Sequence, residues 1–181
     1  VLFCDYNGRI IDIGSIYKIQ DKILLLSTEK MGGKTRKTLI DGKSWDEQCE
    51  IIIADEAIGR ISLVSNDFNS IINRLGFDGV ELERNRILEI EDMIIVKSEY
   101  PGGSILDVLL PLKQIEDIIS MLEEMEFSEM STDRWNFSRL AICVPSLIDV
   151  GGMLPNECGM HNKISKNKGC YPGQEVHARL D

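Results

Sequence analysis

The stretch Lys168-Gly-Cys-Tyr-Pro-Gly-Gln-Glu175 places one cysteine between two glycines. Glycine permits positive φ angles and close backbone approach, and Pro172 stiffens the turn. Such a loop holds Cys170 in one orientation, and a cation at Lys168 favours the thiolate form of a nearby cysteine. The chemistry fits a positioned, reactive cysteine, or a buried and inert cysteine in a tight turn. Taken without their surroundings, these residues favour the inert cysteine.

The same segment resembles the K-G-C-[aromatic]-x-G-Q-E signature of YgfZ-type folate-binding proteins, which are relatives of the glycine-cleavage T protein. Every specified position matches, and at average residue usage such a match arises in about one window in 10^8. Three other segments are similar to motifs of this family: Gly8–Asp12 to G-R-[apolar]-[apolar]-D, Arg139–Pro145 to R-I-E-x-G-x-P, and Leu154–Met160 to L-P-x-E-x-G-L. Ala141 and Cys143 depart from the second motif.

The resemblance implies a ring of α+β subdomains around a channel that holds folate, the aminomethyltransferase-like fold. We expect residues 1–181 to be this folate-binding domain, without the family's N-terminal stretch and C-terminal β-barrel. The order of elements independently predicts an α+β fold, with mostly antiparallel sheets and helices packed on one face. Two sub-domains are expected, about 1–65 plus 126–181 and 66–125.

Alternation and capping signals predict the individual elements. Strands are expected over Gly8–Ile19, Lys22–Ser27, Cys49–Asp55, Ile58–Ser65, Arg86–Ile90, Met93–Ser98, Ser104–Leu110 and, at its start, Val176–Leu180. Helices are expected over Glu29–Ile40, capped by Ser27 or Thr28, over Asn66–Leu75, capped by Asn66 or Asp67, and over Pro111–Met125 and Asp133–Cys143. The stretch Val144–Gly173 reads as a long loop, which in a compact domain is typical of a functional segment.

The resemblance also implies the site residues. Glu157 takes the position that recognises the pterin ring, and a carboxylate suits it because it accepts two parallel N–H bonds. Asp12 takes the catalytic position of the T-protein relatives, and Cys170 is the second candidate catalytic residue. The positions expected to contact folate beside Glu157 are Arg139, Lys168, Tyr171 and Gln174.

The expected function is that of a tetrahydrofolate-binding accessory protein that supports iron–sulfur cluster enzymes. The alternative is a tetrahydrofolate-dependent aminomethyltransferase, which Asp12 and Glu157 favour. Against it stand the Cys170 loop and Ile13, which occupies the place of a second acidic residue. A metal site is a third hypothesis, but the spacing of Cys158, His161, Cys170 and His177 matches no standard zinc module, and no metal is expected.

Composition limits the partners. The net charge of −10 disfavours nucleic acid as a general partner, although Lys163, Lys166, Lys168 and Arg179 form a basic cluster that is either a solvated loop or a small anion site. No apolar run approaches the roughly 20 residues of a membrane span. Five cysteines without a C-x-x-C pair, and a beginning that does not read as a signal peptide, lead us to expect a reducing, cytoplasmic compartment.

Overall fold

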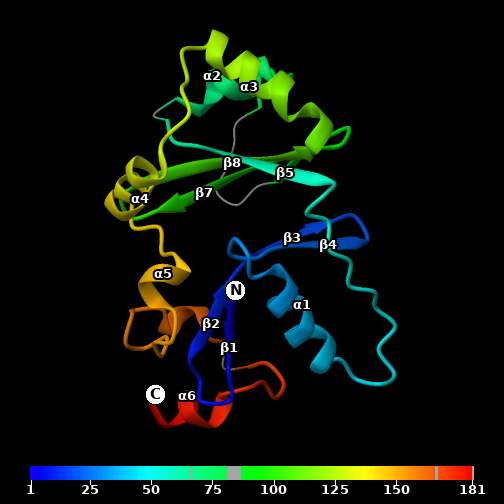
Figure 1. The fold of residues 1–181 in the computed structure, drawn as a ribbon, viewed down its shortest axis with the longest axis vertical. Helices are drawn as coiled ribbons and strands as arrows, with labels where there is room; N and C mark the ends of the chain where they lie inside the picture. The colour runs from blue at the N-terminus through cyan, green and yellow to red at the C-terminus, as the bar shows by residue number, and fades with distance from the viewer. Residues whose placement is uncertain (66, 81–86, 166, 181) are drawn as a thin grey trace. The chain divides into compact units, whose positions relative to one another are not determined.

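The computed structural model describes residues 1–65, 67–80, 87–165 and 167–180. The chain divides into two compact units (Figure 1). The first unit joins Val1–Ile53 to Pro145–Asp181, and the second unit is Ala54–Val144. These bounds differ from the expected division near residues 65 and 126, because the strand that begins at Ile58 and the helix that ends at Ala141 both pack within the second unit.

The second unit contains an antiparallel sheet of order β5-β8-β7-β6. Its strands are β5 (Ile58–Leu63), β6 (Ile87–Ile90), β7 (Met93–Tyr100) and β8 (Gly103–Pro111). Its helices are α2 (Phe68–Arg74), the 3-10 turn η1 (Leu112–Gln114), α3 (Ile115–Glu124) and α4 (Thr132–Ala141). The predicted α+β class with antiparallel pairing is therefore confirmed.

Helices α2 and α3 cover one face of this sheet (Figure 1). Alternate residues of β8, Leu106, Val108 and Leu110, are buried against them, as the period of two along a strand requires. Asp67 caps α2, because its carboxylate accepts the backbone N–H groups of Asn69 and Ser70. Asn66, the other capping candidate, and Arg86, the expected start of β6, lie outside the described residues.

The first unit is built from two hairpins and short helices. Its strands are β1 (Leu2–Cys4), β2 (Ile10–Ile13), β3 (Ser15–Ile19) and β4 (Lys22–Leu26), and its helices are α1 (Gly32–Asp41), α5 (Leu147–Val150), the 3-10 turn η2 (His161–Lys163) and α6 (Gln174–Leu180). β1 pairs with β2, and β3 with β4. The expected single strand Gly8–Ile19 is broken at Gly14, where the chain changes partner and a Cβ would lie 2.9 Å from the Leu26 carbonyl.

Two predicted strands are wrong. Cys49–Asp55 forms no strand. Two of its backbone carbonyls, which in a sheet would accept hydrogen bonds from a neighbouring strand, instead accept from side chains: Ile51 from Arg36 and Cys49 from Lys43. Val176–Leu180 belongs to helix α6, since a local bond from the His177 N–H to the Gly173 carbonyl begins a helical turn. Val176–Leu180 has only five residues, which are too few to distinguish the two-residue period of a strand from the 3.6-residue period of a helix.

The helix predicted over Glu29–Ile40 is present as α1, but neither Ser27 nor Thr28 caps it. Its first residue follows Met31, which makes no side-chain cap. The Thr28 hydroxyl instead donates to the Ile13 carbonyl. Across the described part of the chain, no helix combines the length and the apolar character that a membrane crossing needs.

A close backbone contact joins the two ends of the first unit. Gly173 has a φ of +80°, and a Cβ there would lie 2.5 Å from the Gly8 Cα and 2.8 Å from the Asp5 carbonyl oxygen. The Gly8 turn is itself fixed, because one carboxylate oxygen of Asp5 accepts the backbone N–H groups of Asn7 and Arg9, each at 2.9 Å. The second glycine of the 168–175 segment is therefore required for contact. Gly169 has open space around it and no positive φ.

This contact predicts opposite results for two alanine substitutions in one loop. Gly173→Ala should lower the free energy of unfolding by about 1–3 kcal/mol, through left-handed strain and overlap with Gly8. Gly169→Ala, the matched control, should change it by less than about 0.5 kcal/mol. Urea unfolding measures both, and equal effects of the two substitutions would contradict the contact.

Candidate functional site

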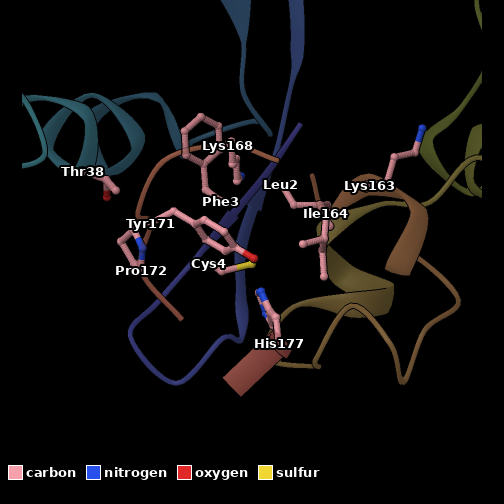
Figure 2. A pocket seen from close by; sticks show the side chains of 10 residues that line it. All are labelled: Leu2, Phe3, Cys4, Thr38, Lys163, Ile164, Lys168, Tyr171, Pro172 and His177. Carbon is pink, nitrogen blue, oxygen red and sulfur yellow. The ribbon is translucent and has the colours of Figure 1, made fainter. Parts of the chain in front are cut away.

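A small pocket opens in the first unit, beside the 168–175 segment (Figure 2). Its volume is about 160 Å³. The lining comes from β1, α1, the end of η2 and the residue after it, the 168–175 loop and α6. The residues are Leu2, Phe3, Cys4, Thr38, Lys163, Ile164, Lys168, Tyr171, Pro172 and His177. Two of the predicted folate-contacting residues, Lys168 and Tyr171, therefore line one cavity.

His177 forms one end of the pocket and is 3% exposed. Its Nε2 lies 2.8 Å from the Gly8 carbonyl oxygen. A carbonyl only accepts, so Nε2 carries a hydrogen and donates it, and in the neutral ring Nδ1 is then an acceptor. Nδ1 is buried and has no hydrogen-bond partner among the described residues. Buried polar atoms are seldom left in this state.

Tyr171 stands between a cation and this imidazole. The Lys168 ammonium lies 4.0 Å from the centroid of the Tyr171 ring, a cation–π arrangement. The Tyr171 and His177 rings have centroids 5.8 Å apart and are inclined by 33°. The predicted residues Lys168 and Tyr171 are thus positioned against each other and against a histidine.

Cys4 supplies a neutral thiol to the pocket. It is half-buried, and burial raises its pKa to about 11, with the Asp5 carboxylate acting in the same direction and the Lys168 ammonium opposing both. At neutral pH this sulfur is protonated, and therefore a poor nucleophile.

Cys170 lies outside the pocket lining and is exposed. It immediately precedes Tyr171, which lines the pocket. The interpretation as an inert buried cysteine is wrong, because the residue is exposed. Its reactivity stays a prediction.

Asp12 is buried and accepts three hydrogen bonds. One carboxylate oxygen accepts the Ile13 N–H at 2.8 Å and the Thr28 N–H at 3.1 Å, and the other accepts the Thr35 hydroxyl at 2.5 Å. Thr35 lies on α1, three residues before the pocket residue Thr38. Asp12 therefore attaches α1 to β2 and so positions one wall of the pocket. It does not line the pocket, and a catalytic role stays a prediction.

The other predicted residues lie elsewhere. Glu157 is exposed, and one of its carboxylate oxygens accepts the Leu154 N–H at 2.8 Å. Arg139 belongs to the second unit, where it is buried and donates to the Asn136 side chain at 2.8 Å. Gln174 begins α6 and is half-buried. None of the three lines the pocket, so their roles toward folate stay predictions.

Sequence reasoning missed Cys4 and the burial of His177, and it grouped His177 only with possible metal ligands. Within the described ranges, no three His, Cys, Asp or Glu side chains gather to hold a metal ion. Of the basic cluster, Lys163 and Lys168 line the pocket, Arg179 pairs with Glu175, and Lys166 lies outside the described residues. His177 lies four residues after Gly173, one of the two glycines of the 168–175 segment, and this spacing is one sequence signal that could have indicated its burial.

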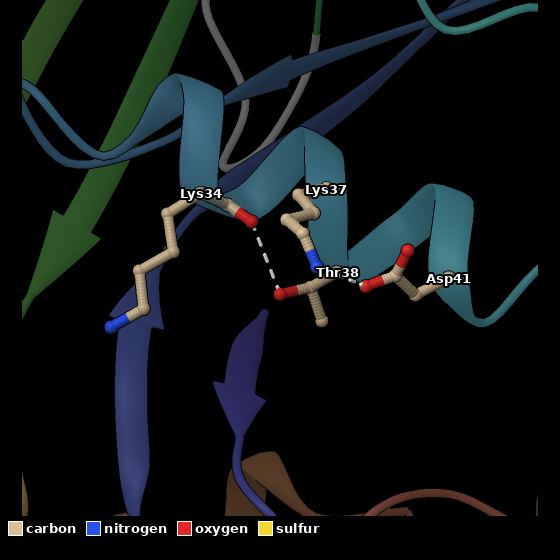
Figure 3. A network of polar contacts seen from close by, with 4 residues as sticks. All are labelled: Lys34, Lys37, Thr38 and Asp41. Carbon is tan, nitrogen blue, oxygen red and sulfur yellow. Dashed lines mark hydrogen bonds and ion pairs between the residues drawn. The ribbon is translucent and has the colours of Figure 1, made fainter.

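Asp12→Ala should lower the free energy of unfolding by about 3 kcal/mol, because three donors lose a charged acceptor. The matched control is Asp41→Ala, which replaces an aspartate of α1, the helix that Asp12 binds through Thr35. Asp41 pairs with Lys37 at 2.8 Å on the surface, and Figure 3 shows this pair beside the bond from Thr38 to the Lys34 carbonyl. The control should change stability little, because exposed ion pairs are screened by water. Equal losses in chemical denaturation would contradict the role of Asp12.

Iodoacetamide at pH 7.5 should modify Cys170 faster than Cys4, since Cys4 is half-buried and its raised pKa keeps it protonated. Mass spectrometry of peptides over time gives each rate. The exposed Cys49 and Cys143 are internal controls. If Lys168 activates Cys170, Lys168→Met should slow the modification of Cys170 to about the rate of Cys49 and Cys143. Faster modification of Cys4 than of Cys170 would contradict the half-buried, protonated state of the Cys4 thiol.

A scan against protein-family models finds none that matches this chain, and a search of the curated proteins returns no match either. The functional argument therefore depends on the residues themselves.

Proposed function

We propose that this protein is a tetrahydrofolate-binding accessory protein that supports the assembly or maintenance of iron–sulfur cluster enzymes, built on the aminomethyltransferase-like fold. The proposal comes from the motif resemblance of four segments. The observation that carries it further is that three of these segments, far apart in sequence, pack against one another in the first unit, and one of them, Lys168–Glu175, lines a pocket there.

These contacts are specific. The Gly8 carbonyl accepts from His177 at 2.8 Å, and Gly8 abuts Gly173 of the signature segment. Next to Gly8, the Arg9 guanidinium donates to the Gly152 carbonyl at 2.7 Å. Ile10 exchanges backbone hydrogen bonds with the residues that lead into Leu154–Met160: its N–H donates to Met153, and its carbonyl accepts from Gly152. Motifs that share one site are expected to meet in this way.

The pocket suits part of a folate. Its volume of about 160 Å³ is below the roughly 300–1,000 Å³ of sites that enclose a drug-sized ligand. The aromatic face of Tyr171 and the Lys168 cation match the flat rings and carboxylates of the cofactor. One part of the ligand would enter, and the rest would extend over neighbouring surface. Bound tetrahydrofolate would supply a carrier of one-carbon groups.

The accessory role is preferred to aminomethyl transfer because of Asp12 and Cys170. Both oxygens of Asp12 already accept hydrogen bonds from the protein. An exposed cysteine beside the pocket suits transient contact with a partner enzyme. No turnover of an aminomethylated carrier protein is expected, and measurable turnover would favour the transferase instead.

Titration with tetrahydrofolate tests the binding step. At 100 times its dissociation constant, the ligand should add about 2.7 kcal/mol to the free energy of unfolding. Glu157→Gln keeps an oxygen for the Leu154 N–H but removes the charge. It should weaken folate binding about tenfold, if the carboxylate pairs with the pterin ring, and leave the unliganded protein as stable as before. No stabilisation by folate at any concentration would refute the proposed ligand.

Complementation in cells tests the accessory step. Cys170→Ser should fold and bind tetrahydrofolate like the unaltered protein, yet fail to support an iron–sulfur client enzyme. Cys49→Ser, which replaces another exposed cysteine, is the matched control and should complement fully. Full support by Cys170→Ser would show that the cysteine is dispensable and that folate binding alone carries the function.

A further inference from the structure

The segment that follows helix α1, residues 44–53, presents three large apolar side chains to solvent. Trp45 is 98% exposed, Ile52 is 73% exposed and Ile53 is 51% exposed. Single apolar residues on a surface are ordinary, whereas exposed apolar residues that are grouped mark interaction sites. Tryptophan is a residue that proteins bury for most of its surface, and it is enriched among the residues that dominate binding energies between proteins. The 44–53 segment therefore carries the side chains of a docking surface.

Two cationic side chains hold this segment in the first unit. Arg36 on α1 donates to the Ile51 carbonyl at 2.9 Å, and Lys43, which follows the helix, donates to the Cys49 carbonyl at 2.7 Å. The backbone forms neither helix nor strand from residue 47 to residue 54. The segment is thus attached to its unit at fixed points but has joined none of the sheets described there.

Other backbone groups of the segment are unpaired. The N–H and C=O groups of Glu50, Ile52 and Ile53 make no hydrogen bond within the residues that the structure describes. The run of three isoleucines has the β-branched composition that strands favour. Unpaired backbone groups along such a run are a template for a strand of another chain. The recognition mode that fits is the addition of an extended peptide, in which main-chain hydrogen bonds supply the affinity.

The charge of the segment selects the kind of partner. Its charged side chains are the exposed carboxylates of Asp46, Glu47 and Glu50, and residues 44–53 contain no lysine, arginine or histidine. The same segment of a second copy would bring carboxylates against carboxylates, which destabilises paired strands. Lysine or arginine side chains are attracted instead, and Trp45 adds the aromatic face on which cations bind best.

We propose that the 44–53 segment is a docking site for a basic, extended peptide of a partner protein. The peptide pairs as a strand along residues 49–53, its apolar side chains lie against Trp45 and the isoleucines, and its cations pair with the three carboxylates. No residue of the segment lines the pocket beside the 168–175 loop. The inference therefore depends neither on folate nor on Cys170.

The probe is a short synthetic peptide of alternating lysine and valine, with blocked ends. Two matched peptides each lack one feature: alternating lysine and serine keeps the charge, and alternating glutamate and valine keeps the apolar side chains. Calorimetric titration of the full chain should give saturable binding of the lysine–valine peptide, about tenfold weaker binding of the lysine–serine peptide, and none of the glutamate–valine peptide. Added salt should weaken the binding, because it screens exposed charges.

Substitutions in the chain locate the binding. Trp45→Ala should weaken the lysine–valine peptide about tenfold, whereas Tyr6→Ala, which removes another exposed aromatic side chain of the same unit, should leave it unchanged. Ile52→Pro removes a backbone N–H that a paired strand would use and should also weaken the peptide about tenfold. The urea midpoint of this variant should stay unchanged, because that N–H has no partner within the described residues.

Tryptophan fluorescence reads the contact directly. The chain has two tryptophans, so Trp135→Phe leaves Trp45 as the reporter. Its emission should move to shorter wavelength when the lysine–valine peptide covers the exposed indole, and it should stay in place with the glutamate–valine peptide.

Three results would overturn the inference. The first is the absence of saturable binding, or equal binding of the lysine–valine and lysine–serine peptides, which would indicate unspecific attraction to the net charge of −10. The second is binding that Trp45→Ala leaves unchanged. The third is self-association of the chain that Trp45→Ala abolishes, because a second copy would then occupy the segment. Folate titrations do not enter this test, so their outcome leaves it intact.

Discussion

The close approach of Gly8 and Gly173 is the constraint on which the candidate site depends. It brings together two stretches of backbone that are more than 160 residues apart in sequence, and no side chain fits between them. The bond from His177 to the Gly8 carbonyl, between residues 169 positions apart, lies next to this contact. Together they fix the end of the 168–175 loop against the first hairpin, so Tyr171 and Lys168 meet Cys4.

A second anchor acts on helix α1. The Asp12 carboxylate on β2 accepts the Thr35 hydroxyl on α1, and this sets the helix that carries Thr38 to the pocket. Asp12 and Gly8 lie within one short stretch of the chain. The Gly8–Asp12 segment therefore positions two of the lining elements, the 168–175 loop and α1: its glycine acts through the backbone and its aspartate through a buried side chain. The family resemblance implies a catalytic role for Asp12, whereas its hydrogen bonds show that it holds helix α1 in place beside the pocket.

Elements with strong local signals were predicted well. Helix α2 has an aspartate cap and an apolar face, and the predicted strands for β7 and β8 correspond closely to those observed. Local information misled where contacts from elsewhere decide the outcome. The apolar run Ile51–Ile53 has the composition of a strand, but Arg36 takes the Ile51 carbonyl and both Ile52 and Ile53 are exposed. The alternation in Val176–Leu180 was too short to exclude a helix.

The sequence by itself determined the α+β class and the positions of most helices and strands. These follow from periodicity, capping and turn chemistry, which act over a few residues. Only the tertiary structure decided that His177 is buried with one nitrogen lacking a partner among the described residues, that Cys4 is a protonated pocket thiol, and that Glu157 is exposed. Burial and solvation of a side chain depend on neighbours from distant parts of the chain, and no local pattern encodes them.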